Sequence, residues 1–354
     1  MNSSFWKNKK VLLTGHTGFK GSWLSLWLKR LNVDLIGFSN SVPTKPSLFE
    51  LAGIEETITS ITGDISDPSQ ISDVIKKYNP DIIIHMAAQS LVLKSYEYPL
   101  ETFSTNTMGT VNLLDAIRKV GTPKVVLNVT SDKCYENKEL GLKFKEDDPI
   151  GGLDPYSSSK GCAELVTSAF RNSFFNIDDF DRHHVAIASV RAGNVIGGGD
   201  WAEDRLIPDI FKNILVNKPI KIRNPDSIRP WQFILDALYG YLLLIEKLWD
   251  DGIKYSGAWN FGSMEDARTV SWITKKLSEL WDVNIDWEFE KKDHKHEAKY
   301  LELDCSKSSR MLDWKPKMDL SMTLEWIVNW YKQYQQKNDI RPFTEKQIEK
   351  YNSL

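Results

Sequence analysis

Three chemically active side chains follow one another where an apolar run ends in the first half of the chain. The run closes with Val129 and Thr130, and Ser131, Asp132 and Lys133 come directly after it. A hydroxyl, an acid and an amine in this order could bind a substrate oxygen, donate a proton and accept a proton. A polar turn with an exposed ion pair would have the same composition, because charge pairs at strand ends are common and contribute little.

A tyrosine and a lysine lie four residues apart in the segment PYSSSKG. On a helix, Tyr156 and Lys160 would present their phenol and amine on one face. Such pairs also occur by chance on helix surfaces. Here the pair follows the strand that ends at Ser131, so we expect Ser131 to face Tyr156 across a crevice at the carboxyl ends of the strands.

Short apolar runs alternate with segments of helical period throughout the first half of the chain. The expected strands are residues 10–15, 33–38, 59–64, 81–88, 124–130 and 185–192. The expected helices between them are residues 21–31, 68–78, 106–120 and 155–175. This alternation predicts an α/β fold with a doubly wound parallel sheet of the Rossmann type.

The alternation loosens after the segment RAGNVIGGGDW. We expect a Rossmann domain over residues 1–192, with a return segment at about residues 228–250, and a smaller mixed α/β substrate domain over residues 193–338. Residues 339–354 are expected to form a polar tail. Two long helices are predicted in this half, at residues 233–250 and 320–336.

The turn after the first expected strand contains Gly15, Gly18 and Gly21. A tight turn, a close approach of the backbone to a pyrophosphate, and close packing of helix on strand each require a glycine. The spacing G-x-x-G-x-x-G differs from the G-x-G-x-x-G fingerprint, and three glycines alone are often only a turn. The flanking strand and helix favour a dinucleotide site.

The second expected strand lacks the acidic residue that commonly holds the adenosine ribose. Only Ser39 and Asn40 stand at its end, which puts the cofactor affinity in doubt. No arginine is present there for a 2'-phosphate, so NAD is favoured over NADP. Asp64, after the third strand, could meet the adenine edge or serve as a turn residue.

With a nicotinamide in this site, the tyrosine and lysine acquire a redox role. The positive nicotinamide and the Lys160 ammonium are expected to lower the pKa of Tyr156 by favouring phenolate. Tyr156 would then take a proton from a substrate hydroxyl while a hydride leaves for NAD, Ser131 would bind the same oxygen, and Lys160 would hold the nicotinamide ribose. Asp132 and Lys133 are not needed for this oxidation.

The motifs TGHTGFKG, HMAAQS, NTMGTVNLL, YSSSK and RAGNVIG occur in the order typical of the extended short-chain dehydrogenase/reductases, which the chain resembles over nearly its whole length. Within that superfamily, GHTGFKGSWL, TSDKCYEN, GGGDW, RPWQ and HEAKYLELD resemble the 4,6-dehydratases that act on CDP-glucose. The resemblance implies conversion of CDP-D-glucose to CDP-4-dehydro-6-deoxy-D-glucose, a step toward dideoxysugars, with NAD regenerated in each cycle.

The resemblance also implies the residues that hold each ligand. The cofactor contacts are expected from Gly15, Thr17, Gly18, Phe19, Lys20, Gly21, Asp64, Ile65, Ala87, Ala88, Asn106, Tyr156 and Lys160. The substrate contacts are expected from Gln89, Asn194, Arg205, Arg229, His296 and Tyr300, with Asn194 and Arg229 at the pyrophosphate. Relatives commonly pair through two long helices of the first domain, so a homodimer or homotetramer is expected.

Asp132 and Lys133 gain a role once C4 of the sugar is a ketone, because the hydrogen on C5 is then acidified. A base near C5 and an acid near the C6 hydroxyl would eliminate water. Related dehydratases that act on thymidine-linked glucose carry glutamate where this chain has Lys133, which makes lysine the candidate base. Lys133 must then be neutral and Asp132 protonated, and the two could share one proton.

Composition excludes several other classes of protein. The chain has 45 basic and 48 acidic side chains and no long basic run, which argues against nucleic-acid binding. Its three cysteines lack metal-ligand spacing and its paired histidines lack further ligands, so no metal site is expected. Few cysteines and no apolar segment of signal-peptide or membrane-spanning length predict a soluble cytoplasmic protein.

Two other functions are compatible with parts of the pattern. A nucleotide-sugar 4-epimerase or reductase would use Tyr156 and Lys160 without an elimination, so Asp132 beside Lys133 argues against it. A nucleotide-binding scaffold with an inactive site is the second alternative. The intact set of Ser131, Tyr156 and Lys160 argues against that one.

Overall fold

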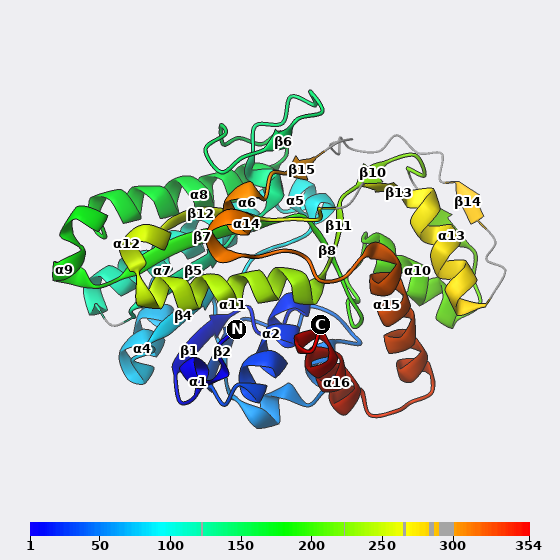
Figure 1. Ribbon diagram of the computed structural model, residues 1–354, viewed down its shortest axis with the longest axis horizontal. Helices are drawn as coiled ribbons and strands as arrows, with labels where there is room; N and C mark the ends of the chain where they lie inside the picture. Colours follow the sequence, from blue (N-terminus) through cyan, green and yellow to red (C-terminus); the bar gives the residue numbers. More distant parts are fainter. Residues whose placement is uncertain (122, 223, 265–266, 283–286, 290–300) are drawn as a thin grey trace.

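A seven-stranded parallel sheet forms the centre of the protein (Figure 1). The computed structural model describes residues 1–354 except 122, 223, 265–266, 283–286 and 290–300. The strand order is β12 (Gly257–Phe261), β7 (Ala186–Ala192), β5 (Val125–Val129), β4 (Ile82–His85), β1 (Lys10–Thr14), β2 (Asp34–Ser39) and β3 (Thr59–Thr62). The predicted Rossmann-type α/β fold is confirmed, and six of the seven strands are those expected from the sequence.

The central strands alternate between two apolar cores. Leu12 and Ile83 point to one core, whereas their chain neighbours Val11, Leu13 and Ile84 point to the other. This is the period of two expected for strands, with both sheet faces buried because both are covered by helices.

Helices cover the two faces as separate layers. Helices α4 (Pro68–Tyr78), α7 (Gly109–Val120) and α8 (Pro155–Ser173) pack side by side, and α4 and α7 supply the smaller core. The opposite face is covered by α2 (Phe19–Arg30) and α11 (Ile234–Asp250), which contribute to the larger core. No helix among the described residues is long and apolar enough to cross a membrane.

Shorter elements complete the first half. They are α1 (Ser3–Trp6), α3 (Leu48–Leu51), η1 (Ile54–Thr57), α5 (Val92–Glu97), α6 (Pro99–Phe103), η2 (Ser104–Met108), η3 (Asp132–Cys134), β6 (Lys143–Phe144), η4 (Ile177–Asp179) and α9 (Phe180–His183). Of these, η2 is a π-helical turn that leads into α7, and η3 is the 3-10 turn that directly follows Ser131.

Small strand pairs and further helices complete the second half of the chain. The pairs are β8 (Asn194–Ile196) with β11 (Trp231–Phe233), β10 (Ile228–Arg229) with β13 (Arg268–Thr269), β9 (Ile220–Ile222) with β14 (Trp287–Phe289), and β6 with β15 (Glu302–Leu303). The helices are α10 (Leu206–Leu215), α12 (Gly252–Tyr255), α13 (Val270–Trp281), α14 (Ser306–Leu312) and α15 (Leu320–Gln335). Figure 1 shows α10, α13 and α15 gathered at one end of the molecule.

The chain returns to the sheet after residue 228, and the return is longer than expected. Helix α11 packs on the sheet, and β12 then pairs with β7 as an edge strand. Residues 257–261 therefore belong to the sheet although they lie outside the expected return segment of 228–250. The domain boundary at residue 192 stays a prediction.

Residues 340–352, expected as part of a polar tail, form helix α16 (Ile340–Asn352) against α2. Its buried residues Ile340, Thr344, Ile348 and Tyr351 follow a helical spacing. The Tyr351 ring packs edge-on against Trp27 of α2. The helix was not predicted because its few apolar residues give only a weak helical periodicity in the sequence. In the structure, the aromatic contact and the hydrogen bonds of Thr344 and Tyr351 hold it in place.

Candidate active site

Two cavities open at the carboxyl ends of the sheet strands. The first has a volume of about 710 Å³ and is lined by the turn after β1, the ends of β2 to β4, and the segment between residues 40 and 48. The second has a volume of about 300 Å³ and is lined by the turn after β5, by β8 and by the start of α10. Lys20, Tyr156 and Arg205 line both cavities, so the two meet at these side chains.

The glycine turn packs so closely that side chains are excluded at two positions. Gly15 has φ of +77°, and a Cβ there would lie 2.7 Å from the backbone nitrogen of Ala87. A Cβ at Gly21 would overlap the carbonyl oxygen of Gly15. Gly18 is the N-cap of α2, and Thr17, Phe19, Lys20 and the three glycines all line the first cavity. This geometry fits a dinucleotide diphosphate at the start of α2.

The end of β2 carries neutral groups, as the sequence indicates. The hydroxyl of Ser39 lies 3.0 Å from Nδ1 of His16, whose Nε2 lies 2.9 Å from the hydroxyl of Ser60. Burial lowers the pKa of His16 to about 4, so the ring is neutral near pH 7. A ribose bound there would meet no carboxylate from Ser39 or Asn40, both of which line the cavity.

The other predicted cofactor residues divide into two groups. Asp64, Ile65, Ala87 and Ala88 line the first cavity. Asn106 does not, because its amide is used inside the protein. Its Oδ1 accepts from the backbone nitrogen of Gln89 at 2.8 Å, and its Nδ2 donates to the hydroxyl of Ser159 at 2.9 Å. Asn106 therefore fastens the loop after β4 to α8.

The turn after β5 brings Ser131, Asp132 and Lys133 into the second cavity. The Ser131 hydroxyl accepts from the Lys133 backbone nitrogen at 3.2 Å and donates to Oδ1 of Asp132 at 3.0 Å. Nζ of Lys133 lies 3.8 Å from the same Oδ1. Asp132 is 1 % exposed and its Oδ2 has no hydrogen-bond partner among the described residues, so the alternative of an exposed ion pair is excluded.

Tyr156 stands in the first turn of α8 with its ring buried against this segment. Burial raises its pKa, while Lys133 and a hydrogen bond with Ser131 lower it, and the net effect is a raised pKa. The protein groups alone thus do not give the predicted lowering, because desolvation outweighs the nearby charge. The cation that lowers the pKa of Tyr156 most is Lys133, rather than Lys160.

Lys160 lies one helical turn after Tyr156 and lines the first cavity. Its ammonium donates to the carbonyl oxygen of Val129 at 3.4 Å. Burial lowers its pKa to about 8, against an opposing effect from the carboxylate of Glu164. The amine is therefore mostly protonated near pH 7 and faces the space expected for the nicotinamide ribose.

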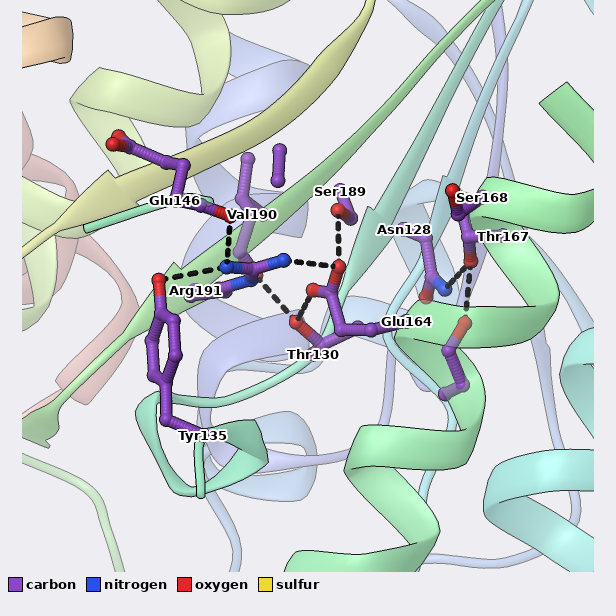
Figure 2. A network of polar contacts seen from close by, with 12 residues as sticks. Asn128, Thr130, Tyr135, Glu146, Glu164, Thr167, Ser168, Ser189, Val190 and Arg191 are labelled. Carbon is purple, nitrogen blue, oxygen red and sulfur yellow. Dashed lines mark hydrogen bonds and ion pairs between the residues drawn. The ribbon is translucent and has the colours of Figure 1, made fainter. Parts of the chain in front are cut away.

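A buried polar network holds these elements together, and Figure 2 shows Arg191 of β7 at its centre. Arg191 Nη2 lies 2.8 Å from Glu164 Oε2, and both side chains are 4 % exposed. Glu164 also accepts from the hydroxyls of Thr130 and Ser189. Because Glu164 belongs to α8 and Thr130 precedes Ser131, this carboxylate joins the helix that carries Tyr156 to the turn that carries the acid and amine.

The same network extends to the segment after η3. Arg191 Nη1 donates to the Tyr135 hydroxyl at 2.7 Å and to the carbonyl oxygen of Glu146 at 3.0 Å. Tyr135 in turn donates to Oδ1 of Asn260 at 2.7 Å. The chain is thus fixed on both sides of the Ser131–Lys133 turn.

The predicted substrate residues are only partly brought together. Asn194 and Arg229 line the second cavity alone, and Arg205 lines both. Arg205 Nη1 lies 3.0 Å from Oδ2 of Asp200, and its Nη2 donates to the Ser90 hydroxyl at 3.1 Å. Gln89 lines the first cavity with its amide bonded to Leu91 and Thr102. His296 and Tyr300 lie outside the described residues.

Sequence reasoning missed the residues that support the site. No sequence motif marks Thr130, Glu164 or Arg191 as part of the site. The one available signal is the position of Glu164 four residues after Lys160, which puts both side chains on the same face of the helix. Asp200, the partner of Arg205, stands in the quoted motif GGGDW. Lys20 was assigned to the cofactor alone, whereas it lines both cavities.

Comparison with known proteins identifies the family of the chain. A family model described as GDP-mannose 4,6 dehydratase matches residues 12–326. A CDP-glucose 4,6-dehydratase of Salmonella typhimurium (strain LT2) is 50 % identical, covering 100 % of this chain and 99 % of the relative. Two solved structures superpose with TM-scores of 0.78, a dTDP-glucose 4,6-dehydratase of Bacillus anthracis in complex with NAD and a UDP-glucose 4-epimerase of Thermotoga maritima with UDP-glucose.

These two structures are 21 % and 20 % identical to the chain, cover 95 % and 92 % of it, and are each covered over 99 % of their own length. At that identity they show the fold alone. By fold and by the site at its strand ends, the protein is an extended short-chain dehydrogenase/reductase. With the family model matching most of its length and the 50 % identical relative all of it, the chain belongs to the nucleotide-sugar 4,6-dehydratases, a family of hydro-lyases.

Proposed function

We propose that the protein dehydrates CDP-D-glucose to CDP-4-dehydro-6-deoxy-D-glucose, with NAD as its cofactor. The 50 % identical relative supports this substrate. The observation that carries the proposal is the position of Asp132 and Lys133 beside Ser131 and Tyr156 in one cavity. Oxidation at C4 needs only the serine and tyrosine, so a buried acid and an amine next to them indicate a second chemical step.

The first cavity fits NAD. The glycine turn and the start of α2 would hold the diphosphate through backbone N–H groups, and Asp64 would reach the adenosine. Lys160 would bind the nicotinamide ribose. When bound, NAD supplies the acceptor for the hydride of C4 and later the donor of that hydride to C6.

Tyr156 carries the proton in the oxidation step. It takes the proton of the C4 hydroxyl, while Ser131 hydrogen-bonds the same oxygen. Burial raises the pKa of Tyr156, and Lys133 and Ser131 oppose that rise. A positive ring bound in the first cavity would shift the pKa of Tyr156 further down.

Lys133 and Asp132 carry the elimination step. Lys133 takes the proton of C5, the electron pair of that bond forms the C5=C6 double bond, and the C6–O bond breaks as Asp132 gives its proton to the departing hydroxyl. Water leaves. Lys133 then returns a proton to C5 as the hydride reaches C6, and the proton left on Tyr156 balances the one that Asp132 has lost.

The nucleotide end of the substrate would occupy the part of the second cavity lined by Asn194, Arg229 and Trp231. An asparagine amide and an arginine can donate hydrogen bonds to diphosphate oxygens, and the tryptophan offers an aromatic face. Arg205, already paired with Asp200, would complete this side at the junction of the cavities.

We propose further that two copies of the chain pair through α7 and α8. Leu165 on α8 is 59 % exposed, and Met108, immediately before α7, is 49 % exposed. Exposed apolar side chains on neighbouring helices suit an isologous contact between copies. The three cysteines are free thiols, which fits the proposed cytoplasmic location.

A substrate panel tests the proposed reaction. The protein is incubated with CDP-, dTDP-, UDP- and GDP-glucose, with and without added NAD, and the products are weighed by mass spectrometry. Loss of one water from CDP-glucose is the expected result, and a requirement for added NAD would agree with the neutral groups at the end of β2. A product of unchanged mass would indicate an epimerase and contradict the proposal.

A further inference from the structure

Two buried oxygen atoms near the Ser131–Lys133 turn lack hydrogen-bond partners among the residues that the structure describes. One is Oδ2 of Asp132, whose other oxygen, Oδ1, accepts from the Ser131 hydroxyl. The other is the hydroxyl of Tyr241 on α11, a side chain that is 0 % exposed. Buried polar atoms without a partner in the protein are normally hydrogen-bonded to ordered water.

The packing of α11 brings these two oxygens into the same region. Helix α11 packs on β5 and β7. The Tyr241 ring lies edge-on against Phe261, with ring centroids 5.7 Å apart, and Phe261 pairs with Ala192 at the end of β7. The next residue, Gly193, contacts the acid, because a Cβ built there would lie 3.4 Å from Oδ2 of Asp132. Tyr241 is therefore packed against the strand end that borders the Asp132 carboxylate.

The charge of Asp132 acts on Tyr241, although the two side chains share no direct hydrogen bond. Burial raises the pKa of the Tyr241 phenol, and the Asp132 carboxylate raises it further. Elsewhere in the protein, Tyr351 and Asp236 show the direct contact, with their oxygens 2.6 Å apart. Tyr241 and Asp132 are thus close enough to interact through charge but do not bond directly, and one water molecule fits between such a pair.

A third buried polar group faces the same region. Both amide atoms of Gln232 on β11 lack partners within the described part of the chain, and the side chain is 2 % exposed. Gln232 pairs with Val195 in the parallel register of β11 and β8, so their side chains share a face. Gly193 precedes Val195 by two residues and lies on that face, which contacts Oδ2 of Asp132. The Gln232 amide therefore offers a donor and an acceptor near the acid.

Resting on the proposed function, we propose that one buried water molecule joins the Tyr241 hydroxyl to Oδ2 of Asp132, with the Gln232 amide as its third partner. The water accepts a hydrogen bond from Tyr241 and donates one to Oδ2. When Asp132 gives its proton to the departing C6 hydroxyl, this donor stabilises the carboxylate that forms. Tyr241 and Gln232 are thus positioning residues for the elimination. Oxidation of C4 does not need them, because Tyr156 and Ser131 carry that step.

Single-turnover kinetics separate the two steps. Tyr241→Phe removes only a hydroxyl, and Gln232→Leu removes the amide at nearly constant volume. Each variant is mixed with NAD and CDP-glucose, absorbance of the reduced cofactor follows C4 oxidation, and mass spectrometry of quenched samples follows the loss of water. Oxidation should stay within about twofold of the wild-type rate, whereas elimination should slow by about 10-fold, so that reduced cofactor accumulates.

The double variant tests whether both side chains act through the same water. Tyr241→Phe combined with Gln232→Leu should eliminate water no more than about twofold more slowly than the slower single variant, because the water is lost only once. Independent contacts would instead give the product of the two single losses.

Urea unfolding tests the water without any measurement of activity. If the Tyr241 hydroxyl is bonded to water, Tyr241→Phe removes a partner of that water and lowers the urea midpoint. If the hydroxyl is unpaired, the substitution removes a costly buried polar group and raises the midpoint. We expect a lower midpoint.

Tyr239→Phe is the matched control, since it makes the same substitution two residues earlier on α11. The Tyr239 ring is half-buried, packs against Tyr351 and the Lys317 ammonium, and lines neither cavity. This variant should oxidise C4 and eliminate water at the wild-type rates.

Four results would overturn the inference. They are elimination at the wild-type rate in both single variants, an equal loss of oxidation and elimination, losses that multiply in the double variant, and a urea midpoint for Tyr241→Phe that does not fall. If the wild type dehydrates CDP-glucose and one of these results appears, only the inference fails. If the wild type does not dehydrate any of the sugar nucleotides, the proposed function fails, and the urea midpoint still decides whether the water is present.

Discussion

The Lys133 amine is the group on which the elimination depends. We expect Lys133→Ala to retain oxidation of C4 and to lose exchange of the C5 hydrogen with solvent by a factor of at least about 100, because the general base is absent. Lys133→Arg should behave in the same way, since a guanidinium stays protonated. Reduced cofactor is followed by absorbance, and deuterium at C5 by mass spectrometry in D₂O.

Lys138→Ala is the control for that experiment. Lys138 follows in the same segment but is exposed and pairs with Glu136 at 3.3 Å. The Lys138→Ala variant should catalyse exchange of the C5 hydrogen and dehydration of the substrate at the wild-type rate. Full dehydration by Lys133→Arg would show that another group removes the C5 proton.

At the residue scale, the proximity of the candidate catalytic groups could be predicted but their electrostatics could not. The adjacent residues Ser131, Asp132 and Lys133 at the end of a strand predict a shared site, and the structure places all three in one cavity. The raised pKa of Tyr156 depends on burial, which a local motif does not reveal. That Lys20 lines the second cavity as well as the first could not be predicted either, because which cavity a side chain enters depends on tertiary structure.

At the scale of elements, the Glu164–Arg191 ion pair joins α8 to strand β7 of the sheet. Glu164→Gln should lower the free energy of unfolding by about 3–5 kcal/mol, because it leaves Arg191 buried without its carboxylate. Urea unfolding followed by circular dichroism measures the change. The pair is 2.8 Å apart with both side chains 4 % exposed, so solvent screens it little.

Two exposed ion pairs that share Asp115 on the adjacent helix provide the comparison. Asp115 of α7 lies 2.7 Å from both Arg118 and Lys119, and Asp115→Asn should cost less than about 1 kcal/mol. If the two substitutions cost the same, burial does not determine the strength of the Glu164–Arg191 pair.

Among the elements, long periodic segments were predictable and short or sparse ones were not. Helices α4 and α8 begin where the sequence places them, each with an acidic N-cap and a proline in the first turn. Strand β12 has the sequence GAWNF, which is too short and too mixed to be distinguished from a loop. Its place in the sheet comes from pairing with β7, a partner about 70 residues away in the chain.

At the scale of the whole molecule, Asp236 links the C-terminal helix to the rest of the protein. It is 1 % exposed, and its Oδ1 accepts from the Tyr351 hydroxyl at 2.6 Å and from the Lys317 backbone nitrogen at 2.7 Å. Burial raises its pKa from 3.8 to about 6. The folded protein therefore binds more protons than the unfolded chain between these two values, and its stability falls as the pH rises through that window.

Asp236→Asn removes this dependence, because the amide is neutral throughout and keeps an oxygen for both donors. The variant should gain stability relative to the wild type by about 2–3 kcal/mol between about pH 4 and pH 7.5. Urea unfolding at several pH values measures this difference. Asp250→Asn, at the exposed end of the same helix, should show no such trend, and a flat difference for Asp236→Asn would contradict the assigned shift.

The proposed pairing of two copies is testable through one exposed side chain. Leu165→Asp should convert a dimer into a monomer, because a charge would be buried in the contact between helices. Size-exclusion chromatography with light scattering gives the mass of each form. Leu140→Asp, 73 % exposed in the loop before β6, should remain dimeric, and an unchanged mass for Leu165→Asp would refute this interface.

The late arrival of α11 and β12 has a consequence for how the protein is made on the ribosome. A nascent chain that ends before residue 234 has synthesised six strands of the sheet but neither the helix that covers one of its faces nor the strand that closes the edge at β7. Such an intermediate exposes apolar surface and an unpaired strand edge for as long as translation continues, and it is a target for chaperones and for aggregation.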